Sequence, residues 1–146
     1  MHKVMPEIEQ KITVPILHIA DTTAQKLLEQ GVKKVGLLGT AFTMEQDFYK
    51  GRLTDKFGID VVVPDENERK QVHDIIYQKL CRGEIKEESR VIYSQVIEKL
   101  SQQGAEAVIL GCTEIALLIQ QQHTDVPLFD TTAIHAEAAV SLATSD

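Results

Sequence analysis

Residues 107–119 read AVILGCTEIALLI, and the hydrophobic pattern of this stretch changes at its centre. Residues 105–110 are mostly apolar, which is typical of a short strand buried on both faces of a sheet. The apolar residues that follow recur at the spacing of a helix, at Ile115, Leu118 and Ile119. The stretch therefore predicts a strand, a turn and a helix, with Cys112 on the turn.

This turn places a cysteine where open α/β sheets bind their ligands, at the carboxyl end of a strand. Unpaired backbone N–H groups at the start of a helix carry partial positive charge, which should favour the thiolate of Cys112 and lower its pKa. Cysteine is also among the residue types that are most often buried. Taken alone, the position is as compatible with a small core residue as with a reactive thiol.

The rest of the chain alternates in the same way between strand-like and helix-like stretches. Strands are predicted at 13–19, 33–39, 59–63, 105–110 and 126–130. Helices are predicted at 2–11, 20–31, 40–53, 66–82, 87–103, after Cys112 and at 131–144. This order predicts an α/β fold with a parallel sheet covered by helices on both faces, as in a Rossmann-like lobe.

Polar residues mark the starts of three of these helices. Asp21 or Thr22 would cap the helix at 20–31. Two pairs have the spacing of a capping box, namely Thr43 with Gln46 and Asp65 with Glu68.

Composition narrows the class of protein. The chain has 146 residues, of which 43% are hydrophobic, and 22 acidic against 15 basic side chains give a net charge of −7. This size suits one compact core, and the acidic balance lacks the basic patch that nucleic-acid binding requires.

No apolar run approaches the roughly 20 residues of a membrane span and no signal peptide is present, so we expect a cytoplasmic protein without membrane contact. Two cysteines without paired spacing or a histidine cluster predict reduced thiols and no metal site.

Four blocks of the sequence together resemble one enzyme family. They are LLGTAFTMEQDFYKGRL at 37–53, VVPDENERKQVHDIIYQKLCRGEIKEESR at 62–90, VILGCTEIALLI at 108–119 and PLFDTTAIHAEAAV at 127–140. In this order they are similar to the aspartate/glutamate racemases, which act on amino acids without pyridoxal phosphate. The resemblance extends over nearly the whole chain, so it is far more specific than the GCTE motif alone.

The resemblance implies two α/β lobes with aspartate or glutamate bound between them, one catalytic cysteine in each lobe, and no cofactor. Cys112 matches the cysteine of the second lobe, so the role of proton donor and acceptor at the α-carbon carries over to it. Thr113 and Glu114 match the positions beside this cysteine. Thr40, Ala41 and Thr43 lie in the block that matches a loop facing the substrate. Lys86 or Arg52 could also reach an acidic substrate, although a solvated surface charge is the more common case.

The same resemblance implies that the chain corresponds to the C-terminal part of the family's fold. The family's first cysteine lies in a Cys-x-Asn-Thr turn, and MHKV at 1–4 resembles the sequence that follows that turn. Residues 1–19 would then be a helix and strand of an otherwise missing N-terminal lobe, residues 20–125 the C-terminal lobe, and residues 126–146 a strand and closing helix that would pack on the missing lobe. Apolar residues in the two outer segments would need another partner surface, which predicts a homo-oligomer.

Proton transfer with inversion requires a base on one face of the carbon and an acid on the other. Cys81 is the only other thiol, and its place near the end of an apolar helix predicts a buried structural cysteine. The chain is therefore one acid–base group short, and we expect truncated and impaired racemisation. Backbone N–H groups after Gly39 and Gly111 could stabilise the substrate carboxylate.

Other interpretations stay open at this point. The chain could be a lobe without catalysis that serves binding or assembly, or a superfamily relative such as a maleate isomerase or an arylmalonate decarboxylase. His135 could orient a group near the crevice, although a lone histidine on a helix is more often packed or solvated.

Overall fold

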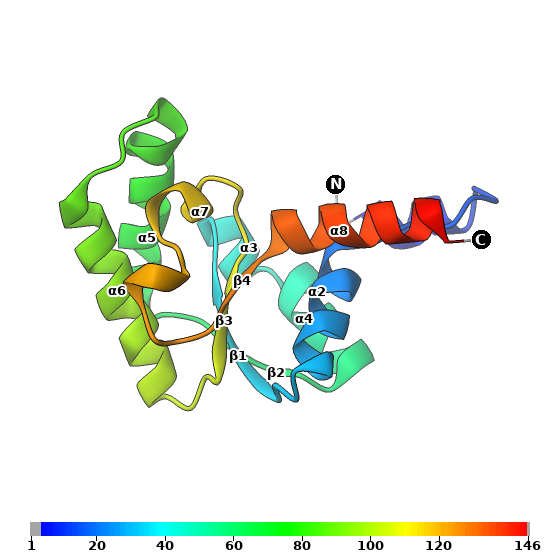
Figure 1. Ribbon diagram of the computed structural model, residues 1–146, viewed down its shortest axis with the longest axis horizontal. Coiled ribbons are helices and arrows are strands. Elements are labelled where there is room, and N and C mark those ends of the chain that lie inside the picture. Colours follow the sequence, from blue (N-terminus) through cyan, green and yellow to red (C-terminus); the bar gives the residue numbers. More distant parts are fainter. Residues whose placement is uncertain (1–3, 146) are drawn as a thin grey trace.

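The computed structural model describes residues 4–145, and in it four parallel strands form one sheet between two layers of helices (Figure 1). The strands are β1 (Lys34–Leu38), β2 (Asp60–Val62), β3 (Ala107–Leu110) and β4 (Leu128–Asp130). They lie in the order β2-β1-β3-β4, and every neighbouring pair is parallel. The predicted parallel α/β sheet is thus confirmed.

The helices divide between the two faces of the sheet. Their bounds are α1 (Met5–Glu9), α2 (Ile19–Glu29), α3 (Ala41–Glu45), α4 (Asp47–Phe57), α5 (Glu66–Gln78), α6 (Glu87–Gln102), α7 (Ile115–Leu118) and α8 (Thr131–Thr144), with 3₁₀ turns η2 (Leu80–Arg82) and η3 (Gln121–His123). Helices α5, α6 and α7 lie on one side of the sheet, and α2 and α4 on the other (Figure 1). The long helices at 66–82, 87–103 and 131–144 were predicted within a few residues.

The continuous apolar run of β3 is explained by burial on both faces. Val108 and Leu110 pack in the cluster with α5, α6 and α7, whereas Ala107 and Ile109 pack in the cluster with α2 and α4. All four side chains are almost completely buried. Successive residues of a strand point to opposite faces, so a strand with helices on both sides has no position for a polar side chain.

Helix α5 begins as the sequence predicts. The Asp65 side chain accepts from Glu68 N at 2.9 Å, and the Glu68 carboxylate accepts from Asp65 N at 3.4 Å. These two bonds form the predicted capping box. The helix ends earlier than predicted, at Gln78, and a 3₁₀ turn completes the segment up to Gly83.

Two other predicted caps are wrong. Helix α2 is capped by His18, whose Nδ1 accepts from Ala20 N at 3.0 Å. The two predicted caps make other contacts: the hydroxyl of Thr22 donates to the carbonyl of Ile19, and Asp21 forms an ion pair with Arg52. The box of Thr43 with Gln46 does not form, since Gln46 has extended backbone angles and separates α3 from α4. The single helix predicted at 40–53 is therefore two helices.

The strand predicted at 13–19 is also wrong. No strand forms there, and α2 already begins at Ile19. The carbonyl of Leu17 lies 2.9 Å from Nε2 of His135 on α8, so this segment packs on a helix, and no strand within residues 4–145 pairs with it. Of the helix predicted at 2–11, residues 1–3 lie outside the described residues, and α1 covers only Met5–Glu9.

The carboxyl ends of β1 and β3 meet at a point where only glycine fits. Gly111 N donates to the carbonyl of Leu38 at 2.7 Å, and a Cβ on Gly111 would lie 2.8 Å from that same oxygen. A Cβ on Gly39 would lie 3.1 Å from the side chain of Thr43. The turns that follow the two strands are consequently held close together.

Replacing Gly111 with Ala should destabilise the fold by about 1–3 kcal/mol, because the new methyl group overlaps a backbone oxygen that cannot move freely. The measurement is chemical denaturation. The matched control is Gly51→Ala within α4, where the nearest atoms to a new Cβ are 3.7 Å away. Because glycine is unfavourable inside a helix, this change should raise the free energy of unfolding by roughly 0.5–1 kcal/mol. Equal stability of G111A and the wild type would contradict the close approach of the two strands.

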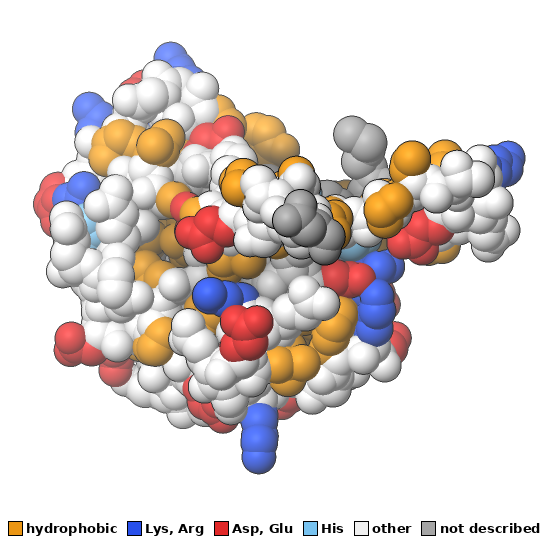
Figure 2. All heavy atoms as spheres, turned by 45° about the vertical axis from the view of Figure 1, so that its right-hand side comes forward, with side chains coloured by type: hydrophobic (Ala, Val, Ile, Leu, Met, Phe, Trp, Pro, Cys, Tyr) orange, Lys and Arg blue, Asp and Glu red, His pale blue; other side chains and the backbone are white. Residues whose placement is uncertain are grey.

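Apolar side chains lie exposed where the ends of the chain extend from the body. Helix α8 projects beyond the sheet, with the N-terminal segment on the same side (Figure 1), and Figure 2 shows hydrophobic side chains along this projection. The exposed ones are Val4, Ile8, Ile12, Val14, Val140 and Leu142. Ile16, Leu17 and Ile134 are only partly buried. So many exposed apolar side chains on one projection are unusual in a monomer.

We predict self-association through this surface. Light scattering should give a mass above that of one chain, and a variant with Val140→Glu and Leu142→Glu should shift it towards the monomer, because two carboxylates cannot be buried in an apolar interface. Val91→Glu is the control, since Val91 is similarly exposed but lies on α6. A wild-type monomer at every concentration would show that the surface is not an interface.

Candidate functional site

Two neighbouring turns at the carboxyl edge of the sheet contain most of the predicted site residues. We call residues 39–43, after β1, the β1 corner, and residues 111–114, after β3, the β3 corner. Strands β1 and β3 pair directly, so the two corners lie side by side. The predicted substrate-facing residues of both corners are thereby brought together, as expected for the carboxyl ends of adjacent parallel strands.

The β3 corner contains a thiol with a carboxylate beside it. Sγ of Cys112 donates to Oε2 of Glu114 at 2.9 Å, and the hydroxyl of Thr113 donates to the same oxygen at 2.7 Å. Burial raises the pKa of Cys112 to about 12, and the hydrogen bond and negative charge of Glu114 add to this effect. The bonds from Cys112 and Thr113 lower the pKa of the Glu114 carboxyl group. At neutral pH, therefore, the cysteine is a thiol and the glutamate a carboxylate.

The predicted lowering of the Cys112 pKa is wrong for two reasons. Helix α7 is a single turn of four residues, and it begins three positions after the cysteine, so its dipole is small. The backbone N–H of Glu114 does lower the pKa of Cys112, but burial of the thiol and the adjacent carboxylate outweigh it. Cys112 is partly buried against the cluster of α5, α6 and α7.

The β1 corner is held by hydrogen bonds among its own residues and by one histidine. The hydroxyl of Thr40 caps α3 by accepting from Thr43 N at 3.4 Å, and the two hydroxyl oxygens lie 3.3 Å apart. Ala41 N donates to Nδ1 of His73 on α5 at 3.0 Å. Of the backbone groups predicted to bind a carboxylate, Ala41 N and Thr43 N thus already have acceptors within the protein.

His73 is the site residue that sequence reasoning missed. It lies in the resembling block VVPDENERKQVHDIIYQ, but no local pattern points from it to the β1 corner. The hydrogen bond joins positions 32 residues apart, and only the fold brings them together.

Cys81 is exposed, so the prediction of a buried structural cysteine is wrong. The reason is the early end of α5, after which Leu80 takes the buried position of the 3₁₀ turn and Cys81 faces outwards. The turn contacts α7, and a charge on Cys81 would raise the pKa of Cys112 further. The second thiol is therefore on the same side of the molecule as the first.

The predicted cations occupy different places. Lys86 is exposed at the start of α6, where residues 80–86 extend past the carboxyl edge of the sheet near α7 (Figure 1). Arg52 instead binds Asp21 through Nη2 at 2.9 Å and is thereby held on α2. Similarly, His135 contacts the carbonyl of Leu17 and does not reach either corner.

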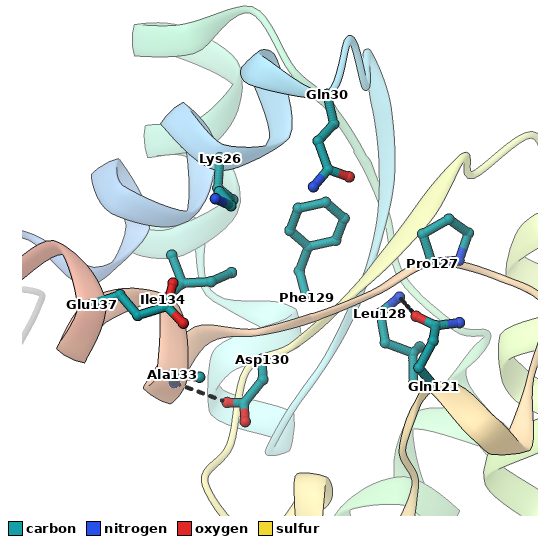
Figure 3. A pocket seen from close by; sticks show the side chains of 10 residues that line it. All are labelled: Lys26, Gln30, Gln121, Pro127, Leu128, Phe129, Asp130, Ala133, Ile134 and Glu137. Carbon is teal, nitrogen blue, oxygen red and sulfur yellow. Dashed lines mark hydrogen bonds between the residues drawn. The ribbon is translucent and has the colours of Figure 1, made fainter.

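A cavity of about 330 Å³ lies elsewhere, beside the edge strand β4 and between α2 and α8 (Figure 3). Its polar lining includes Lys26, Asp130 and Glu137, without a residue of either corner. A smaller cavity of about 280 Å³ includes Leu110 and Ala116, which flank the β3 corner. The position of the thiol, and not the size of a cavity, therefore locates the candidate site.

Two kinds of feature are absent from residues 4–145. Within this range the structure gathers no group of three or more His, Cys, Asp or Glu side chains that could hold a metal ion. Over the same residues, no helix is long and apolar enough to cross a membrane.

A comparison with known protein families matches most of the chain. The sequence profile of the Asp/Glu/hydantoin racemase family matches residues 1–139. The chain belongs to this family. The resemblance derived from the four sequence blocks is confirmed.

Solved structures share the fold of this racemase-family chain. A crystal structure of a candidate Asp/Glu racemase from Yersinia pestis is 54% identical with a TM-score of 0.96, and an aspartate racemase homologue from Pyrococcus horikoshii is 36% identical with a TM-score of 0.91. Each match covers 99% of this chain but 63% of the other. The broad specificity amino-acid racemase RacX of Bacillus subtilis is 25% identical over 96% of this chain and 60% of its own length.

We predict that Glu114→Gln makes Cys112 of this racemase-family chain more reactive. Loss of the carboxylate removes a charge that raises the pKa of the thiol, and each unit by which that pKa falls gives about tenfold more thiolate at a fixed pH. The measurement is the rate of iodoacetamide alkylation of Cys112 in a Cys81→Ser background. That background is needed because the exposed Cys81 should react first in the wild type.

Glu106→Gln is the matched control for this experiment. Glu106 also accepts a hydrogen bond, from Lys33 N at 3.0 Å, but it lies before β3 at the opposite end of the strand. An alkylation rate for E114Q equal to that of E106Q would show that the Glu114 carboxylate does not control the thiol.

Proposed function

We propose that this chain forms the Cys112 half of a cofactor-independent amino-acid racemase site of the aspartate/glutamate type. The observation that carries the proposal is the thiol of Cys112, hydrogen-bonded to the Glu114 carboxylate at the carboxyl end of β3 and adjacent to the β1 corner. Family membership and the racemase names of several relatives support the same reaction class.

In the proposed reaction, Cys112 exchanges one proton with the α-carbon of the amino acid. As an acid, its S–H bond breaks and the carbanion's electron pair forms the new C–H bond, which leaves a thiolate. As a base, that thiolate takes the α-proton from the same face. Because the pKa of Cys112 is raised to about 12, the free site at neutral pH begins in the acid form.

The proposed substrate contacts follow from the two corners. The hydroxyl pair of Thr40 and Thr43 would donate to the α-carboxylate, and Glu114 with Thr113 would face the α-ammonium group. Ala41 would line the β1 corner without donating to the substrate, because its own N–H is bonded to His73. Lys86, on the segment that extends over the edge of the sheet, would attract the side-chain carboxylate of aspartate or glutamate.

Inversion needs a second acid–base group on the opposite face of the substrate. The two solved structures above contain chain that has no counterpart in this one, since the matches cover 63% of each. We therefore propose that residues 4–145 support exchange of the α-proton on one face, and that full racemisation requires a further surface. The exposed apolar projection is the proposed contact for that surface or for a second copy of the chain.

A non-catalytic role in binding or assembly is the second candidate. Two observations favour it: the protonated state of Cys112 and the exposed apolar side chains of α1 and α8. Both would be expected of a lobe whose contribution is an interface.

A deuterium experiment distinguishes the two candidates. With L-aspartate in D₂O, we expect slow incorporation of deuterium at the α-carbon without change of handedness, and a rate that rises about tenfold per pH unit below the pKa of Cys112 as the thiolate fraction grows. Nuclear magnetic resonance measures the exchange, and chiral chromatography measures D-aspartate. L-glutamate is tested in parallel.

The variants assign the exchange to one thiol. Cys112→Ser should abolish exchange, whereas Cys81→Ser should leave it unchanged. Racemisation at roughly 1 per second or faster that survives C112S would refute the assignment of the base. No exchange and no binding of either amino acid in the wild type would favour the non-catalytic role.

A further inference from the structure

His73 differs from the other histidines that accept a backbone hydrogen bond. Nδ1 of His18 and of His123 accept from residues two and three positions away, so each caps its own helix or turn. Nδ1 of His73 accepts from Ala41 N at 3.0 Å, across 32 positions of sequence. The bond therefore joins α5 to the β1 corner, where it gives an acceptor to the first N–H group of α3, which has none within its own helix.

Helix α5 is a firm support for this bond. Its first turn is closed by the capping box of Asp65 with Glu68, and Glu68 is paired with Lys99 of α6. Tyr93 of α6 also donates to the carbonyl of Val72 at 3.1 Å, one position before His73. The imidazole itself packs against the ring of Tyr77, with ring centroids 4.7 Å apart. These contacts fix the imidazole relative to the core.

The β1 corner, by contrast, has little stability of its own. Helix α3 is five residues long, and a single helical turn is unstable in isolation because nucleation is costly. The corner also touches the β3 corner, since a Cβ on Gly111 would lie 3.5 Å from Cγ2 of Thr43 and one on Gly39 would lie 3.5 Å from the carbonyl of Gly111. A shift of the first corner would thus reach the turn that carries Cys112.

The bond has a second effect on the β1 corner. It occupies Ala41 N, and Thr43 N is occupied by the hydroxyl of Thr40. The side-chain hydroxyls of Thr40 and Thr43 are therefore among the donors of the corner that can turn towards a carboxylate. Acceptance through Nδ1 requires the neutral tautomer of His73 with its proton on Nε2.

We propose that His73 is a positioning residue for the site around Cys112. Its bond to Ala41 N holds the β1 corner on α5, so that the hydroxyl pair of Thr40 and Thr43 keeps a fixed place beside the β3 corner. This inference rests on the proposed proton-transfer function, but the bond and its effect on the two corners can be measured without turnover.

Two substitutions at one position separate the bond from the packing. His73→Asn keeps an acceptor near the place of Nδ1, whereas His73→Phe keeps a planar ring against Tyr77 and has no acceptor. We expect H73F to lower the protection of the Ala41 amide against hydrogen exchange by roughly three- to tenfold, which corresponds to the net stabilisation by one hydrogen bond. H73N should leave this protection near the wild-type value. His123→Ala, which loses a similar bond in η3, is the control.

The functional readouts use the same variants. H73F should slow α-deuterium exchange into L-aspartate by a similar factor and change the alkylation rate of Cys112 in the Cys81→Ser background, whereas H73N and H123A should match the wild type. Unchanged Ala41 protection in H73F would overturn the inference. The inference would also fail if H73F lost protection of the Ala41 amide without any change in the alkylation rate of Cys112. It would fail as well if H73N and H73F changed amide protection and Cys112 reactivity equally.

A failure of the proposed function remains distinguishable from a failure of this inference. If the wild type exchanges no α-hydrogen, the racemase proposal fails. The Ala41 amide and the alkylation of Cys112 then still decide whether His73 positions the two corners: a change in H73F with retention in H73N supports the role, and any other pattern overturns it.

Discussion

The hydrogen bond from Gly111 N to the carbonyl of Leu38, at 2.7 Å, is the constraint on which the candidate site depends. It extends the pairing of β1 and β3 by one step beyond the strands, at a place where a Cβ would meet that same oxygen at 2.8 Å. The two chains separate immediately afterwards, one into the β1 corner and the other into the β3 corner. Glycine at this point thus determines that a thiol and a pair of hydroxyls leave the sheet as neighbours.

Burial and a nearby carboxylate together decide the protonation of that thiol. The start of a helix favours a thiolate, but here the helix is one turn long and begins after the cysteine, so its effect is local and weak. Removal of water from a partly buried sulfur and a negative charge at hydrogen-bond distance both favour the neutral form. The balance therefore lies with the thiol, and the helix N-terminus is the smaller influence.

The elements that the sequence predicted well are those fixed by local chemistry. The doubly buried β3 follows from its apolar run, the start of α5 from the pair Asp65 and Glu68, and α8 from the residues that follow β4. Errors arose where a distant contact decided the outcome. The segment at 13–19 is apolar enough for a strand but has no partner strand, and Cys81 became exposed because α5 ended one turn early.

The candidate site was predictable to a similar extent. The corners could be located because GCTE and GTAFT each follow a strand, and parallel strands end at one edge. The pKa of Cys112 could not be predicted, since it depends on how deeply the sulfur is buried and on the rotamer of Glu114. His73 could not be found either, because its contact with Ala41 exists only once α5 has packed beside α3.

Under the proposed function, the raised pKa of Cys112 has a cost and a use. An increase of one unit reduces the thiolate population at neutral pH about tenfold, whereas the intrinsic reactivity of the thiolate grows only about threefold if its Brønsted coefficient is near 0.5. Alone, the site is therefore better suited to donate a proton than to remove one. A substrate ammonium group beside Glu114 would reverse part of this balance, because it offsets the charge that disfavours the thiolate. Amino-acid binding would in this way prepare the base that the free site lacks, which makes Glu114 the link between substrate recognition and the chemistry of the thiol.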